Sequence, residues 1–527
     1  MKLKNIIIYS YLIVAGLLIS CNEDFLDRPP LAQISSENFY QTKDDLRLAT
    51  AALYGGGPWA EWTYNSYLPV GDVLSGNMAV GYWGDAVQLT TFSVTGLNGI
   101  MVANWKSMYS IIGHCNATIK GIMENAPATL AESDKNAAIA EARFIRGFAY
   151  YNLALLWGAV PIIEDNTELI TSPLVPRYEV KDVYQFVVND LTFAAENLPP
   201  SDTKGRLTTW SAQGMLGKVY LTWAGLAPEG VGQRDQEMLD KARFYAGNVC
   251  KNSGLALLDN YANLFRTEYN DNQESLFSLQ WSPGLGWMEG NMLQIYSSGG
   301  ADIAPSGGQG WFGIGPTIDM FELYTEEDSI RRKATFMLRG DHYPELNAAG
   351  GGFTYSGNSG LKKHIVGTNA DNGSPTMNLT SSPQHNPLLR LADVYLLYAE
   401  AILGNNATTS DSDALFYFNE VRARAGLDPV SSIDADILLK ERRIELAGEG
   451  HFWSDLVRLS YYNSPKAIGI LNNEQRVRFD YEDGVATPNS PFGEITPANA
   501  NTFTFPLPSR EVTANPKLLE PPVPYSF

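Results

Sequence analysis

The chain has few of the residues from which most enzymes and metal sites are built. Its 527 residues include only three cysteines and five histidines. It contains no His-Glu-x-x-His zinc motif, no Gly-x-Ser-x-Gly nucleophile motif, no phosphate-binding Gly-x-x-x-x-Gly-Lys-Ser/Thr loop and no Cys-x-x-Cys pair. We therefore expect no catalytic residue, no metal site and no cofactor. A glycoside hydrolase needs only two carboxylates; no pair among the 58 acidic residues stands out, so this activity is the less favoured alternative.

Positive charge is also scarce. The 38 lysines and arginines face 58 acidic residues, which gives a formal net charge of −20. Such a chain repels phosphate backbones, so we expect no nucleic acid partner. The same charge would equally serve to keep an extracellular protein in solution, so it does not identify a ligand.

Long apolar runs are absent beyond the N-terminus, so we expect no transmembrane helix. The apolar run over residues 6–19 follows lysines and is typical of a signal peptide, here residues 1–20. It ends at Ser20 and Cys21, and a small residue before cysteine is what lipoprotein signal peptidase accepts. We predict that Cys21 is acylated and that residues 21–40 form a lipidated tether, so that lipid alone holds the protein at a membrane.

The other two cysteines, Cys115 and Cys250, both fall in helical patterns far apart in the chain. One disulfide between them is possible in an oxidising compartment. Two free thiols are the favoured interpretation.

Helical periodicity dominates residues 41–260 and 389–527. From residue 389 to 459 the pattern predicts three helices and the start of a fourth, with short turns between them. The apolar stripes of the first two are Leu391, Val394, Tyr395, Tyr398 and Ile402, then Ala414, Phe418, Val421 and Ala425. Tightly joined pairs of this kind form tetratricopeptide-like helical hairpins. Earlier helices are predicted to open at Thr42 or Lys43 and to cover residues 104–124, 133–157 with Ser133 as N-cap, 179–197, 209–226 and 235–253.

Four charged residues lie close together in the third of these C-terminal helices: Glu441, Arg442, Arg443 and Glu445. They could be read as an acid/base cluster. At this spacing we expect ion pairs that tie neighbouring hairpins together. His451 and Asp455, one helical turn apart, could share a hydrogen bond in the same structural way.

Residues 59–99 and 261–388 lack the helical period and are rich in glycine, asparagine and aromatic residues. A disordered linker would be poor in aromatics, so we predict an aromatic loop over 59–99 and an ordered, loop-rich insertion over 261–388. The apolar face of a sugar ring packs on a flat aromatic ring, while its hydroxyls need polar side chains. The candidate glycan-binding residues are Asp72, Asn77, Tyr82, Trp83, Trp287, Tyr296 and Trp311, with Asp85, Trp281 and Asn291 beside them. For any one aromatic, burial in the core remains an equal alternative.

The C-terminal stretches that begin Arg390-Leu-Ala-Asp-Val-Tyr, Asn419-Glu-Val-Arg-Ala-Arg and Glu441-Arg-Arg-Ile-Glu-Leu together resemble the SusD/RagB family. Phe452 departs from the family, where many members carry arginine. The resemblance implies an all-α, tetratricopeptide-like helical array with a loop-rich aromatic insertion. It also implies a lipid-anchored protein on the surface of the outer membrane that captures oligosaccharide or polysaccharide for a SusC-like TonB-dependent barrel. Peptide binding, or a structural lid on the barrel, remains the alternative because some relatives serve peptide uptake.

Overall fold

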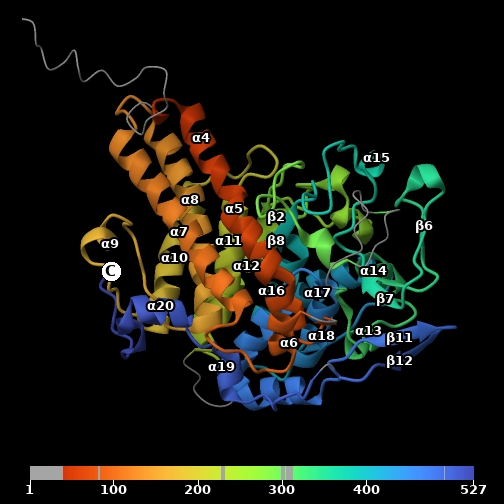
Figure 1. Ribbon diagram of the computed structural model, residues 1–527. Helices are drawn as coiled ribbons and strands as arrows, with labels where there is room; N and C mark the ends of the chain where they lie inside the picture. The colour runs from red at the N-terminus through yellow and green to blue at the C-terminus, as the bar shows by residue number, and fades with distance from the viewer. Residues whose placement is uncertain (1–38, 81–82, 227–231, 298–302, 304–312, 492) are drawn as a thin grey trace, which may run out of the picture.

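The computed structural model describes residues 39–80, 83–226, 232–297, 303, 313–491 and 493–527. The predicted signal peptide, Cys21, Tyr82 and Trp311 lie outside these residues. No helix in the described part is long and apolar enough to cross a membrane. Figure 1 shows the red-to-yellow helices side by side at the left and the green insertion at the right.

Antiparallel helices form the body of the protein, so the predicted all-α array of helical hairpins is confirmed. Consecutive helices pack on one another in the order α7, α8, α10, α11, α12, α16 and α17. Their bounds are α4 Lys43–Ala51, α7 Gly99–Asn125, α8 Glu132–Trp157, α10 Val180–Asn197, α11 Thr209–Trp223, α12 Gln236–Asn252, α16 Leu391–Leu403, α17 Ser412–Arg424, α18 Ala435–Glu445 and α19 Phe452–Asn473. Helices α8, α11 and α16 form an inner layer with mostly buried side chains.

The N-termini of α4 and α8 show where capping residues in the sequence predict a helix start and where they do not. Helix α4 opens at Lys43, one of the two predicted starts, and Thr42 caps it through a capping box with Asp45. The prediction that Ser133 caps α8 is wrong, because the helix begins one residue earlier, at Glu132, and its N-cap Ala131 offers no side-chain hydrogen bond. Tertiary packing on α7 and α10 fixes this helix without a cap.

The prediction of a loop over residues 59–99 is wrong for its first half, which is helical and largely buried. Helix α5 (Gly57–Trp62) continues into two π-helical turns, η2 (Thr63–Tyr67) and η3 (Pro69–Val73), and α6 (Gly84–Thr90) follows. A π-turn adds a residue to the repeat, so the apolar positions lose the 3.6-residue period that marks a helix in sequence. The pattern therefore suggested a loop where the chain forms a wide helix.

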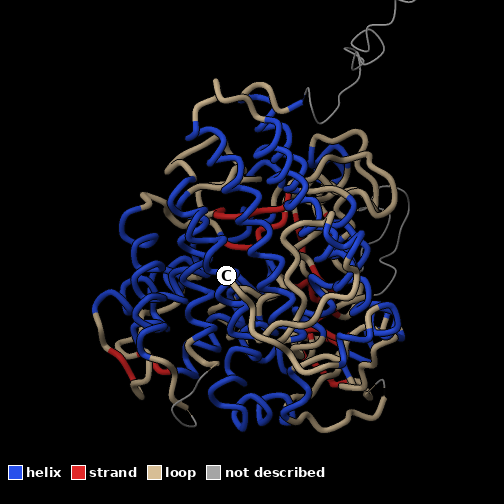
Figure 2. The backbone as a smooth tube through the Cα atoms, turned by 90° about the vertical axis from the view of Figure 1, so that its left-hand side faces the viewer, coloured by secondary structure: helices blue, strands red, loops and turns tan. Residues whose placement is uncertain are grey.

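The insertion consists of loops, short antiparallel strand pairs and short helices, among them α13 (Ile318–Glu322), α14 (Ser329–Thr335) and α15 (Asn369–Asn372) (Figure 1). Across the described chain the strands are short beside the helices (Figure 2). The strands of the insertion are β2 (Ser275–Leu279), β3 (Gly315–Pro316), β4 (Phe336–Leu338), β5 (His342–Tyr343), β6 (Phe353–Thr354), β7 (Ser359–Leu361) and β8 (Asn386–Arg390). β2 pairs with β8, which leads directly into α16 and so joins the insertion to the helical array. β3 pairs with β1 (Met78–Ala79), which connects the insertion to the segment before α6. A hairpin of β11 (Phe479–Glu482) and β12 (Val485–Pro488) projects beside it (Figure 1).

Buried ion pairs cross between the helices, as the cluster around Arg442 predicts. Arg442 donates to Asp393 of α16 at 2.8 Å and to Asp455 of α19 at 2.9 Å. Glu441 accepts from Arg331 at 2.6 Å, and Glu445 pairs with arginines from three other segments: Arg331, Arg390 and Arg424. These residues are structural ties. We name this set of buried ion pairs the ionic core.

The side chains of His451 and Asp455 do not share the hydrogen bond that their spacing allowed; only Asp455 N donates to the main-chain carbonyl of His451, at 3.2 Å. His451 Nδ1 lies 2.9 Å from Lys218 Nζ, and Asp455 is held by Arg442 and Arg458. Burial lowers the pKa of His451 to about 4, so the ring is neutral at pH 7 and accepts from the ammonium group. Cys115 and Cys250 are free thiols, which confirms the favoured interpretation.

Candidate functional site

Four aromatic rings from both predicted ligand regions come together, two of them at the surface and two beneath it. Tyr64 and Tyr296 stack with ring centroids 5.6 Å apart, and Trp83 stacks on Tyr296 at 6.1 Å. Trp287 meets Tyr64 edge to face at 5.7 Å. We name Tyr64, Trp83, Trp287 and Tyr296 the aromatic platform. The structure thus joins three predicted site residues from distant parts of the chain.

The exposure of these rings separates contact residues from supporting ones. Trp287 is 48% exposed and Trp83 is partly exposed. Tyr64 and Tyr296 are buried, with 8% and 0% of their surface accessible. The two indoles can therefore meet a ligand, whereas the two phenol rings form the layer beneath them.

Each ring is held by its own local structure. Tyr64 belongs to the π-turn η2, and Trp83 is the N-cap residue of α6, with its carbonyl accepting from Val87 N at 2.9 Å. Tyr296 ends the short 3₁₀ helix η6 (Leu293–Tyr296), and its hydroxyl donates to the main-chain carbonyl of Tyr64. Burial raises the pKa of Tyr296 well above its ordinary value, so the phenol keeps this proton.

Asp72 and Asn77 are fully buried and serve the framework of the site. The Asp72 carboxylate accepts from Asn77 Nδ2 at 2.9 Å, Gly448 N at 3.0 Å and Gly450 N at 2.9 Å. A Cβ on Gly71 would come within 2.2 Å of the Gly450 Cα, so the two main chains cross in direct contact here. The hydrogen bonds of Asp72 thus join η3 to the chain between α18 and α19. Neither the Asp72 nor the Asn77 side chain reaches the surface.

The neighbouring candidates are also mostly internal. Trp281 is buried and donates to Asn386 Oδ1 at 2.6 Å, and the buried Asn291 donates to the carbonyl of Gln384 at 2.7 Å. Asp85 is partly exposed in the first turn of α6. Sequence reasoning missed Tyr64 altogether. It lies at the start of the predicted aromatic loop, and the only signal was its place in a run of aromatics from Trp59 to Tyr67.

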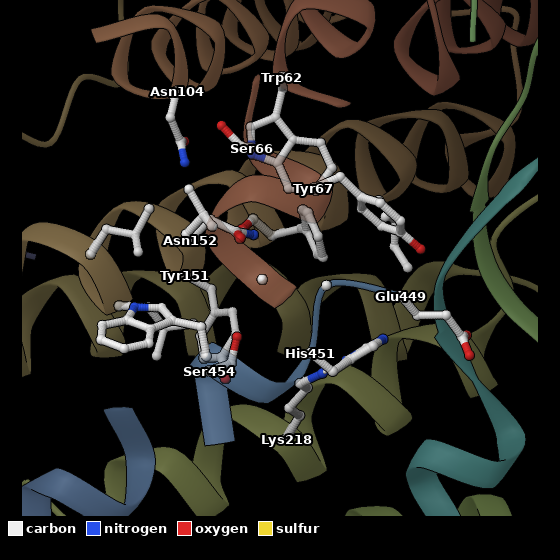
Figure 3. A pocket seen from close by; sticks show the side chains of 18 of the residues that line it. Trp62, Ser66, Tyr67, Asn104, Tyr151, Asn152, Lys218, Glu449, His451 and Ser454 are labelled. Carbon is white, nitrogen blue, oxygen red and sulfur yellow. Dashed lines mark hydrogen bonds between the residues drawn. The ribbon is translucent and has the colours of Figure 1, made fainter. Parts of the chain in front are cut away.

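A small internal cavity lies between the chain that follows α5 and the residues around His451 (Figure 3). Its accessible volume is about 60 Å³, far below the roughly 300 Å³ at which small-molecule pockets begin. Ser66 and Asn104 approach it from one side, and Lys218 and His451 from the other (Figure 3). The cavity is too small for a sugar ring.

A larger hollow, about 820 Å³, lies elsewhere, between α7, α8 and α10. Its charged side chains already have partners, such as Lys120 with Asp165 at 2.7 Å and Arg146 with Asp190 at 2.8 Å. We choose the platform and not this hollow as the candidate site, because a sugar ring packs on the flat face of an aromatic side chain. The volume of the hollow does not provide such a face. No cluster of histidine, cysteine or carboxylate side chains that could hold a metal ion occurs in the described part of the chain.

Comparison with known proteins gives consistent results over the whole chain. The SusD family profile matches residues 342–523, and a profile described as starch-binding, associating with outer membrane, matches residues 24–221. A SusD-like protein of Bacteroides ovatus is 37% identical over 100% of this chain and 99% of its own length. SusD-like protein P25 of Formosa agariphila is 26% identical, with 99% and 98% covered.

Solved structures share the fold. A crystal structure with xylogluco-oligosaccharide has a TM-score of 0.85 and 38% identity, and the match covers 92% of this chain and 99% of that one. A laminarin-binding SusD-like protein has a TM-score of 0.66 at 24% identity, with 90% and 98% covered. The second likeness supports the helical fold alone.

Proposed function

Because the chain belongs to the SusD/RagB family, we propose that it captures an oligosaccharide or polysaccharide at the cell surface and passes it to a SusC-like TonB-dependent barrel. The protein would act by binding alone. Captured glycan held beside the pore has a raised local concentration there, so modest affinity suffices.

The observation that carries this proposal is the exposed indole of Trp287 beside the partly exposed Trp83, with Tyr64 and Tyr296 buried beneath them. Rings fixed from below lose little conformational freedom when a sugar packs on them. Trp311 and Tyr82, which lie outside the described residues, stay predicted glycan contacts. Asp72 and Asn77 would serve the site as part of its buried framework.

The ligand we propose to test first is a xylogluco-oligosaccharide. The 38% identical solved structure contains this ligand, and the match covers 92% of this chain. A neutral glucan also suits an acidic protein better than a uronate does.

Lipid on Cys21 would anchor the protein to a membrane. The description of the profile that matches residues 24–221, associating with outer membrane, supports the outer membrane as its location. The helical array would then provide the rigid body that docks on the barrel. Globomycin treatment, which blocks lipoprotein signal peptidase, should leave a larger precursor, and Cys21→Ala should release the protein from the membrane fraction. A Cys21→Ala protein that stays in that fraction would contradict the anchor.

Isothermal titration of residues 22–527 tests glycan capture. We expect binding to xyloglucan oligosaccharides, lost or strongly weakened in Trp83→Ala and Trp287→Ala. Phe416→Ala is the matched control, because Phe416 is also an exposed aromatic residue, at 57%, but lies on α17. If no polysaccharide of a broad panel binds the wild type, peptide cargo becomes the better interpretation. Release of reducing sugar would instead indicate a hydrolase.

A further inference from the structure

The two halves of the aromatic platform meet at one short stretch of main chain, residues 313–318, which we name the junction segment. β3 within it pairs with β1, with Ala79 opposite Gly315. Ile314 N donates to the carbonyl of Tyr296 at 3.0 Å, and Thr317 N donates to the carbonyl of Asn77 at 3.1 Å. The segment therefore links the chain that leads to Trp83 with the chain that carries Tyr296.

The guanidinium group of Arg478 lies directly against the junction segment. Its Nη1 donates to the carbonyl of Gly313 at 2.5 Å, and its Nη2 donates to the carbonyl of Ser359 in β7. A Cβ on Gly315 would come within 2.9 Å of Nη2, so only a glycine lets the guanidinium group approach this closely. Arg478 thus ties the junction segment to β7.

This arrangement differs from that of the arginines in the ionic core. Arg442 and Arg390 are held by carboxylates within salt-bridge distance, whereas among the described residues the Asp480 carboxylate acts on Arg478 only from farther away. Burial lowers its pKa below the ordinary arginine value. Burying a cation without a carboxylate partner costs free energy, so the gain has to come from the geometry of its hydrogen bonds.

Arginine is suited to this place because its donors form a rigid, planar fork. Two of them reach carbonyls from separate segments at once, which a lysine ammonium on a flexible stem does with much less precision. Apolar packing also holds the junction segment: Ile314 lies in the main core, and Ile318 packs with Leu338, Val477 and Phe479 in a small separate cluster. Beside these anchors, the Arg478 fork adds the polar tie that joins Gly313 to β7.

We propose that Arg478 is a positioning residue for the aromatic platform: its fork fixes the junction segment and thereby sets Trp83 against Tyr296. The role of this geometry in ligand binding rests on the proposed function. Arg478 itself does not touch the ligand.

The test uses protein labelled with 5-fluorotryptophan and ¹⁹F NMR, which reports each indole separately. Trp83→Phe assigns the Trp83 resonance. We expect Arg478→Gln and Arg478→Lys to shift or broaden this resonance while those of Trp59 and Trp105, both buried in the main core, stay in place. Affinity for a xyloglucan oligosaccharide should fall about fivefold in both variants, because a loosely held site loses binding free energy.

Arg339→Gln is the matched control. Arg339 is exposed and donates to the carbonyl of Tyr481 at 3.1 Å, so it braces the neighbouring β11–β12 hairpin without touching the junction segment. This variant should leave the Trp83 resonance and the affinity unchanged.

Three outcomes would overturn the proposal. The Trp83 resonance could stay unchanged in Arg478→Gln, lysine could restore the wild-type spectrum, or all indole resonances could move together as the melting temperature falls. The last outcome would show a role in folding only. Because the NMR measurement needs no ligand, failure of the wild type to bind any glycan would defeat the proposed function and leave this test of position intact.

Discussion

The ionic core of the helical array and the aromatic platform hold their residues by different means. In the ionic core, charged side chains pair with one another across helices, as Arg442 does with Asp393 and Asp455. In the platform, hydrogen bonds to main-chain carbonyls and ring stacking hold the residues, and Arg478 beside it also donates to carbonyls. The ionic core also reaches into the insertion, since Arg331 pairs with Glu441 and Glu445, whereas the rings of the platform are held without ion pairs of their own.

The largest expected effect comes from breaking the ionic core. Arg442→Ala removes a fully buried cation and leaves Asp393 and Asp455 each with one partner fewer. Loss of one member of a buried ion pair costs about 3–5 kcal/mol. Urea unfolding followed by circular dichroism measures it.

Lys241→Ala is the control for Arg442→Ala, because its pair with Glu237 lies on the surface of α12 and should contribute under about 1 kcal/mol. Equal losses in the two variants would contradict the distinction between buried and surface pairs.

The contribution of Asp72 to stability should change with pH in the opposite sense from that of the ionic core. Asp72 lies where the segment of the aromatic platform meets the chain between α18 and α19. Burial raises the pKa of Asp72 to about 6, and an acid with a raised folded-state pKa costs stability above that pH. As the pH falls from 6 to about 4, this cost, roughly 3 kcal/mol, disappears. Glu449 pairs with Arg390 of the ionic core at 2.7 Å, and this arginine lowers the pKa of Glu449 to about 2 despite burial. The stabilisation from Glu449 is therefore lost as the pH falls from about 4.5 towards 2.

Stability curves of the wild type and Asp72→Asn from pH 7 to pH 4 separate these contributions. Only the wild type should gain stability from Asp72 protonation, so the difference between the two free energies of unfolding should change by about 2–3 kcal/mol over this range. Parallel curves would show that Asp72 titrates normally.

A smaller effect is expected where the ligand meets the platform. Trp287→Ala should lower glycan affinity about tenfold, equivalent to about 1.4 kcal/mol, because the indole face is lost. Since Trp287 is 48% exposed, the free energy of unfolding should change little. Affinity and stability, measured by calorimetry and urea unfolding on the same samples, would move together if Trp287 were instead a core residue.

The smallest effect on affinity is expected from a change in Tyr296, one of the two buried rings beneath the indoles. Tyr296→Phe removes the hydroxyl that donates to the carbonyl of Tyr64, at a cost of about 1 kcal/mol in stability and a two- to fivefold loss of affinity. Tyr343→Phe, which loses a similar bond to the carbonyl of Lys333 at 3.3 Å elsewhere in the insertion, should leave affinity unchanged. If both variants bind alike, Tyr296 does not support the platform.

Much of the helical array could be predicted because its signals are local. Apolar residues at helical spacing marked α10, α12 and α16 to within a few residues. The structural reading of Glu441, Arg442 and Glu445 also followed from helix geometry, which places such residues where neighbouring helices can pair with them.

The sequence by itself therefore determined the helical scaffold and which segments hold the aromatic rings. Only the tertiary structure decided which rings face solvent: Trp287 is exposed, whereas Tyr296, nine residues later, is buried under Trp83 and bonded to Tyr64, 232 positions away. Asp72 likewise became a buried acceptor for the amides of Gly448 and Gly450. The 3.6-residue helical period can be recognised from residues close together in the sequence. The exposure of a loop side chain instead depends on partners that lie hundreds of residues away.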